Sequence, residues 1–133
     1  YTTLFRSQNK IVRNLFGRFF PNLSTIKLYK ELRLLRVADL YLFNVCVLMF
    51  KTLHSNFAPF LRQRISEFER EISYGTRSSR RFATPFPHIN VVKLNFLFQA
   101  LAIWNDLPPC FQEMGELSIF RAALLESLST SYD

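Results

Sequence analysis

The first twenty residues place apolar and polar side chains at the spacing of an amphipathic helix. We expect a helix over residues 4–20 that turns an apolar side toward a core and a basic side toward solvent. Pro21 and Asn22 end this segment, since a proline cannot continue a helix. The apolar positions are Leu4, Ile11, Val12, Leu15, Phe16 and Phe19, and the basic positions on the opposite face are Arg6, Lys10 and Arg13.

A long apolar run occupies the middle of the first half of the chain. Between Leu40 and Phe50 only Asn44 is polar. The run is shorter than the about 20 apolar residues that cross a bilayer, and a helix that is apolar all round must be covered all round. We therefore expect it to be the central helix, with the other helices packed on it. A buried strand is the alternative, which Val45 and Val47 favour weakly, whereas the length favours a helix.

Capping residues and a proline mark where other helices begin. Ser24 or Thr25 can cap a second helix, and Ser118 can cap the last one, "IFRAALLESL". Pro59 suits the first turn of the helix "PFLRQRISEFERE", whose charged side chains form a solvated face. The glycine, prolines, serines and arginines of residues 73–91 predict an irregular loop instead.

The segment "IWNDLPPCF" predicts the end of a helix over residues 92–106. Asn105 can adopt the left-handed conformation that closes a helix, and Pro108 holds Leu107 extended. Pro108 and Pro109 then keep the helix from resuming. Phe120 and its neighbours in the last helix would pack back on the bundle.

These patterns predict a mainly α fold, a small helical bundle of about five helices with an irregular loop around 73–91. Three regions follow along the chain. Residues 1–72 form a basic helical region with the central apolar helix, and residues 73–91 form the Arg/Ser/Pro loop. Residues 92–133 form a C-terminal helical hairpin, joined through the turn at Trp104 to Pro108, that packs on the bundle.

Positive charge is concentrated at the start of the chain. The whole chain carries a net charge of +7 with a pI near 9.9. Residues 1–36 hold eight Lys or Arg against Glu31 alone, whereas residues 82–133 hold more acidic than basic side chains. A polyanion is the natural partner of such a surface, either a nucleic acid or an anionic membrane. The fifteen Phe residues are many for a short chain, so some could face a partner.

Cys46 and Cys110 each stand in apolar surroundings, which favours buried, reduced thiols in an intracellular protein, nuclear or cytoplasmic, over a secreted disulfide framework. The sequence has no starting Met and no signal peptide, so we expect a piece of something longer with no transmembrane segment. His54 and His88 lack partners at metal-binding spacing, carboxylates are sparse, and the glycines are isolated. We expect no metal, no cofactor and no autonomous enzyme.

The strongest functional signal is electrostatic. Arg6, Lys10 and Arg13 on one helix face suit contact with a phosphate backbone. Solubilising charge around a hydrophobic domain explains these residues about as well, and a basic amphipathic helix on an anionic membrane is a weaker third interpretation. A second patch, in the loop, comprises Arg77, Arg80 and Arg81, with Tyr74 and Phe82 beside it for base or sugar contacts.

Four blocks of sequence resemble the C-terminal region, thumb and tail, of non-LTR (LINE-type) retrotransposon reverse transcriptases. The family has a Gln-x-Lys-x-x-Arg helix, a leucine-patterned block with an apolar helix that ends before a proline, a Tyr-x-Thr-Arg element, and a Trp-Asn-x-Leu-Pro ending followed by a helix. The corresponding stretches here are "SQNKIVRNLFG" (7–17), "LYKELRLLRVADLYLFNVCVLMFKTLHSNFAP" (28–59), "YGTRSS" (74–79) and "IWNDLP…LSIFRAALLESL" (103–128).

The resemblance implies a thumb-like part of a polymerase rather than a working polymerase. The aspartate pair of the catalytic palm, the fingers, any endonuclease and a Cys/His knuckle do not occur in this sequence. By resemblance, Gln8, Lys10, Arg13 and Arg77 would contact the nucleic-acid backbone. The residues implied to be structural are Trp104, Asn105, Leu107, Pro108 and Phe120.

The sequence therefore leaves two alternative functions. In the first, the chain is a non-catalytic C-terminal fragment of a retrotransposon reverse transcriptase, an RNA-directed DNA polymerase, and holds an RNA or DNA duplex or single strand without base specificity. In the second, it is a structural or protein-interaction fragment that docks on an upstream polymerase palm domain and binds no nucleic acid itself. Exposed apolar surface would also favour self-association, whereas a membrane is not expected as the main partner.

Overall fold

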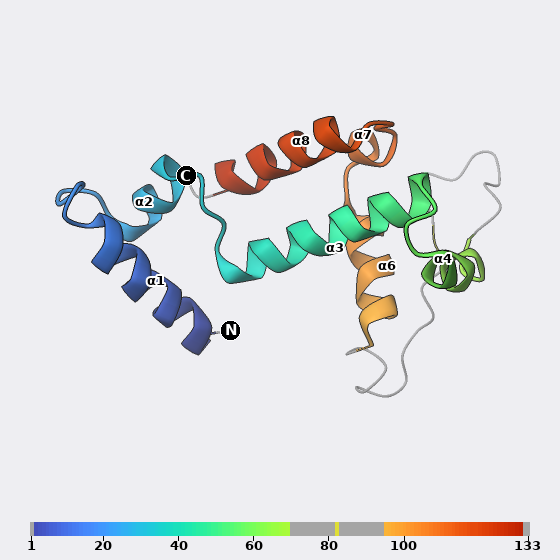
Figure 1. Cartoon of the computed structure of the whole chain (residues 1–133), viewed down its shortest axis with the longest axis horizontal. Coiled ribbons are helices and arrows are strands. Elements are labelled where there is room, and N and C mark those ends of the chain that lie inside the picture. The colour runs from blue at the N-terminus through green and yellow to red at the C-terminus, as the bar shows by residue number, and fades with distance from the viewer. Residues whose placement is uncertain (1, 70–81, 83–94, 132–133) are drawn as a thin grey trace. The chain divides into compact units, whose positions relative to one another are not determined.

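The computed structural model describes residues 2–69, 82 and 95–131 of this chain, and these residues are mainly helical (Figure 1). The predicted fold class is confirmed, but the expected number of helices is too small, since the described residues form seven helices and no strand. The spacing of hydrophobic residues cannot reveal a helix of a single turn, such as α7. The helices are α1 (Thr2–Phe16), α2 (Thr25–Glu31), α3 (Val37–His54), α4 (Pro59–Ser66), α6 (Phe96–Asp106), α7 (Pro109–Gln112) and α8 (Leu117–Thr130).

The chain divides into two compact units, each with its own core. Unit 1 comprises Tyr1–Asn44 and Arg121–Asp133, and unit 2 comprises Val45–Phe120. Most of α8 therefore belongs to the same compact unit as the N-terminal helices α1 and α2. The predicted loop lies outside the described residues except for Phe82, which pairs with Glu69 in an isolated antiparallel bridge within unit 2.

The core of unit 1 forms where α1 and α2 contact each other. Val12 of α1 is buried against Leu28, Tyr29 and Leu35. Ser24 is the N-cap of α2 and accepts a hydrogen bond from the Lys27 N–H, which confirms one of the two predicted caps. The partly buried side chains packed on this core are Phe16, Leu23, Leu32, Phe43, Leu125 and Leu128.

The predicted apolar face of the first helix is only partly correct. Val12 is buried and Phe16 half-buried, but Leu4, Ile11 and Leu15 are 57–60% exposed. The helix also ends at Phe16 rather than near residue 20, because Gly17 follows and the chain turns there. Since α2 packs against only one side of α1, the other apolar positions remain in contact with solvent.

Stacked and tilted rings form much of the core of unit 2. Phe120 stacks on Phe50 at 4.5 Å between ring centroids, and its centroid lies 6.0 Å from that of Trp104 and 6.4 Å from that of Phe111. Phe50, Trp104 and Phe120 are all fully or almost fully buried. The aromatic residues predicted to be structural in this region are therefore core residues of unit 2.

The apolar run lies in a helix, α3, and not in a strand. Its buried side chains include Val45, Cys46, Met49 and Phe50, but Leu40 is 45% exposed, so the expected covering all round is wrong. Among the described helices, α3 is long and apolar enough to cross a membrane by length and composition, with a mean hydropathy of 1.3. One such helix is weak evidence of a span, because the core helix of a folded protein passes the same test.

The turn after α6 differs from the prediction at Asn105. This residue lies within α6, and its carboxamide accepts from the Phe82 N–H at 3.1 Å and donates to the Phe82 carbonyl at 3.0 Å. Leu107 is extended before Pro108, as predicted. Pro109 does not prevent a helix but begins α7, since a proline fits the first helical turn.

Two further predictions near this turn are wrong. Ser118 lies in the first turn of α8, which begins at Leu117, and its hydroxyl donates to Glu116 instead of capping the helix. Cys110 is exposed, because it belongs to the single turn of α7, whereas Cys46 is buried as expected. Pro59 begins α4, as predicted.

Candidate nucleic-acid interface

Arg6, Lys10 and Arg13 form a row of positive charge along α1, which we call the cationic row. Residues at these spacings fall within about 60° of the helix circumference at 3.6 residues per turn. The row extends over about 10 Å along the helix axis. All three residues are exposed, so the predicted shared face exists and is open to solvent.

No carboxylate neutralises the cationic row within the part of the chain that the structure describes. The helix α1 contains no acidic residue, and none of the ion pairs among the described residues involves Arg6, Lys10 or Arg13. Because the charges are unpaired and exposed, they are available to a polyanion at no cost of breaking an ion pair.

One contact orients the third member of the row. The Arg13 Nε donates to the Thr25 hydroxyl at 3.0 Å, which links α1 to the first residue of α2. The bond uses one donor of the guanidinium group and leaves the two terminal nitrogens for another acceptor. Sequence periodicity could not reveal Thr25 as a partner, because the two residues lie 12 positions apart on different helices.

Gln8 has a different environment from the cationic row. Its carboxamide donates to the Leu35 carbonyl at 2.9 Å and accepts from the Val37 N–H at 3.0 Å. These bonds hold the segment between α2 and α3 against α1. A phosphate contact by Gln8 would have to replace them, so Gln8 is not counted with the cationic row. Next to it, Asn9 accepts a hydrogen bond from the Tyr29 hydroxyl at 2.9 Å.

Most of the second predicted patch falls outside the described residues. Arg77, Arg80, Arg81 and Tyr74 lie outside the described residues. Phe82, predicted to stand beside them as an aromatic contact, has 0% exposure, and Asn105 holds its backbone. A side chain buried in the core of unit 2 cannot stack on a base, so that part of the prediction is wrong.

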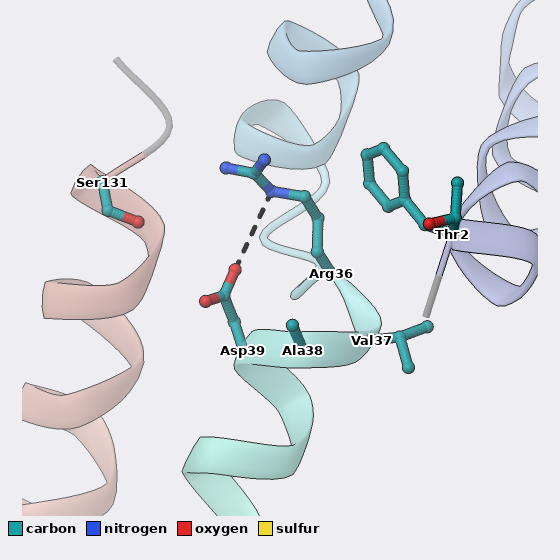
Figure 2. A pocket seen from close by; sticks show the side chains of 7 residues that line it. Thr2, Arg36, Val37, Ala38, Asp39 and Ser131 are labelled. Carbon is teal, nitrogen blue, oxygen red and sulfur yellow. Dashed lines mark ion pairs between the residues drawn. The ribbon is translucent and has the colours of Figure 1, made fainter.

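A cavity of about 420 Å³ in unit 1 lies at the start of α3. Figure 2 shows Arg36 and Asp39 facing each other there, with Thr2 on one side and Ser131 on the other. The Arg36 Nε lies 3.8 Å from the Asp39 Oδ2. Because the lining carries both a positive side chain, Arg36, and a negative one, Asp39, the cavity does not favour an anionic ligand over a cationic one.

Nothing else in the described residues adds a reactive centre. No group of three or more His, Cys, Asp or Glu that could hold a metal ion occurs among them. Burial raises the pKa of the Cys46 thiol to about 11, which keeps it protonated and poorly nucleophilic at neutral pH. Among the described residues, the candidate site is therefore the exposed positive charge of the cationic row.

Comparisons of this chain with protein-family models, curated proteins and solved structures find no match. The resemblance to LINE-type reverse transcriptases remains a prediction from the four sequence blocks. The structure adds one observation of its own, which is the exposed positive charge on one face of α1.

Proposed function

We propose that this chain is a non-catalytic fragment of a retrotransposon reverse transcriptase that holds a template–primer nucleic acid through the cationic row of α1. The observation that carries the proposal is that Arg6, Lys10 and Arg13 share one exposed helix face and have no acidic partner among the described residues. The sequence blocks supply the link to an RNA-directed DNA polymerase. An intracellular location, nuclear or cytoplasmic, accompanies this function.

The contacts in this proposal go to phosphates and not to bases. Arginine and lysine on a helix face neutralise phosphates and release condensed counterions, which gives affinity without sequence specificity. For a duplex, each contact contributes about 0.9 to the slope of log affinity against log salt concentration. At about 0.1 M salt, two contacts are therefore worth roughly tenfold to a hundredfold in affinity relative to 1 M salt.

The test compares two double variants with the same net charge. Arg6→Gln with Lys10→Gln removes two charges from the cationic row, and Arg62→Gln with Arg64→Gln removes two charges from α4. We expect the first variant to bind a fluorescent RNA–DNA hybrid roughly tenfold to a hundredfold more weakly at about 0.1 M salt, measured by anisotropy. The second variant should bind nearly as the wild type does, because its arginines are paired with Glu69 and Glu67.

A second candidate function is favoured by the exposed aromatic rings of unit 2. Phe60 is 78% exposed and Phe57 59% exposed, and the Lys51 ammonium lies 5.1 Å from the Phe57 ring centroid. In this alternative the fragment docks on a polymerase domain and its charge is incidental. Equal hybrid binding by the two double variants, or no binding by the wild type at low salt, would reject the first function and favour the second.

A further inference from the structure

A groove of about 490 Å³ lies within unit 1, between the end of α2 and one face of α8 (Figure 1). Lys30 and Arg33 line it from the side of α2, and Leu125, Glu126 and Ser129 line it from α8. Its volume falls in the range of sites for small molecules. The groove shares no residue with the cationic row, so it is a separate candidate site.

Two opposite charges line the groove without neutralising each other. Arg33 and Glu126 are both exposed, and neither side chain has a hydrogen bond or an ion pair within the part of the chain that the structure describes. Since they line the same groove but do not pair, the groove holds them apart. A ligand that reaches both side chains could therefore bind both at once.

The backbone at Arg33 is a second, independent observation. Arg33 has a φ of 51° and directly follows Leu32, the C-cap of α2. Glycine is the usual residue at such a position, because the left-handed conformation strains residues that carry a side chain. The end of α2 would form more easily with glycine, so the arginine brings its guanidinium group to the groove at a cost in backbone strain. Residues strained in this way gather at ligand sites.

The groove has a donor side and an acceptor side. The α2 side presents the guanidinium group of Arg33 and the ammonium group of Lys30, which only donate. The α8 side presents the carboxylate of Glu126, which only accepts, and the Ser129 hydroxyl, which already donates to the Leu125 carbonyl at 2.8 Å. A ligand that fits both sides offers an anionic acceptor at one end and a hydroxyl donor at the other.

We propose that this groove binds a ribonucleotide, with its phosphate on Arg33 and its ribose 2′-hydroxyl on Glu126. The phosphate is the anionic acceptor, Lys30 adds a second positive charge to the same side, and the ribose supplies the hydroxyl donor. The side chain of Leu125 offers the base an apolar surface. An amino acid also joins an anion to a donor, but two cations on one side suit the larger charge of a phosphate.

A free nucleotide and a nucleotide within an RNA strand share this chemistry. The inference rests on the proposed function only for the strand, because the groove and the cationic row have no residue in common. Within a strand, the groove would distinguish RNA from DNA, which phosphate contacts alone cannot do.

An NMR titration of the isotope-labelled full chain tests the proposal. We expect uridine 5′-monophosphate to shift the amide signals of the groove residues, and its 2′-deoxy analogue to bind roughly tenfold more weakly, since a hydrogen bond to a charged group is lost. Glu126→Ala should bring the ratio of the two affinities close to one. Glu31→Ala is the matched control, because it removes the same charge from an exposed residue of α2 outside the groove, and it should leave the ratio unchanged.

Two further measurements complete the test. Arg33→Asn should weaken both nucleotides roughly tenfold, because asparagine tolerates the left-handed conformation but carries no charge. Fluorescence anisotropy with RNA and DNA single strands of about 12 nucleotides distinguishes the two sources of the ligand. A roughly tenfold preference for RNA that Glu126→Ala abolishes assigns the groove to a strand, whereas equal affinities for the strands with a preference among the nucleotides assign it to the free nucleotide.

Two results would overturn the proposal. The first is a wild type that binds the two nucleotides equally or shows no shift in the groove with either, which needs no variant. The second is a Glu126→Ala variant, folded by circular dichroism, that keeps the preference of the wild type. Salt-dependent binding of both strands with neither preference would reject the groove and leave the cationic row standing. Binding of neither strand would reject the proposed function, and the nucleotide titration would still decide the groove.

Discussion

Replacing Gln8 distinguishes a structural role from a role in binding. The sequence blocks imply that Gln8 contacts nucleic acid, but its carboxamide bonds to the Leu35 carbonyl and the Val37 N–H within unit 1. Gln8→Ala removes both bonds and leaves two half-buried backbone groups without these partners. Since a hydrogen bond contributes about 1 kcal/mol net, we expect the free energy of unfolding to fall by about 2 kcal/mol.

Urea denaturation followed by circular dichroism measures this change directly. The corresponding loss in melting temperature is roughly 6–10 °C for a chain of this size. Gln63→Ala is the matched control, because Gln63 occupies an exposed position in α4 and its side chain makes no hydrogen bond to another described residue. Its free energy of unfolding should change by no more than about 0.5 kcal/mol.

Either of two results would contradict a structural role for Gln8. A Gln8→Ala variant as stable as the Gln63→Ala control would mean that the two hydrogen bonds contribute nothing. A variant of unchanged stability that bound nucleic acid more weakly, with an unchanged salt slope, would place Gln8 in the phosphate contacts that the sequence blocks imply, because a neutral carboxamide releases no counterion.

Three other changes test separate parts of the structure. Arg33 has a φ of 51° at the end of α2, a left-handed conformation that glycine adopts without strain. Arg33→Gly should therefore raise the free energy of unfolding by roughly 0.5–1 kcal/mol in urea denaturation, and a lower free energy of unfolding would contradict backbone strain at this residue. Asn105→Ala removes both bonds to the Phe82 backbone and should cost about 2 kcal/mol in the same assay, and no change would contradict their role. In the native protein at pH 8, iodoacetamide should modify Cys110 and spare Cys46 until denaturant is added, as mass spectrometry would show. Because burial raises the pKa of the Cys46 thiol in the folded state, its contribution to stability is present below about pH 9 and is lost as the pH rises toward 11.

Features that depend on local sequence could be predicted. The apolar run could be assigned to a helix because its length and composition are local, and Ser24 caps α2 through a bond to a residue three positions away. The shared face of the cationic row follows from helical periodicity alone.

Features that depend on distant residues could not be predicted. Gln8 bonds to Val37 across 29 positions, and Asn105 bonds to Phe82 across 23 positions, so no local pattern reveals either contact. Similarly, periodicity shows that α1 has apolar positions but not which of them α2 covers. For this reason Val12 is buried while Ile11, its neighbour in sequence, is exposed.

The salt dependence of nucleic-acid binding tests the claim that the cationic row holds phosphates. The affinity for an RNA–DNA hybrid is measured from about 50 to 200 mM salt for the wild type and for Arg6→Gln with Lys10→Gln. We expect the slope of log affinity against log salt to become shallower by about 1.8 in the variant, from two lost phosphate contacts. The same slope in both proteins would contradict the claim, even if the variant bound more weakly.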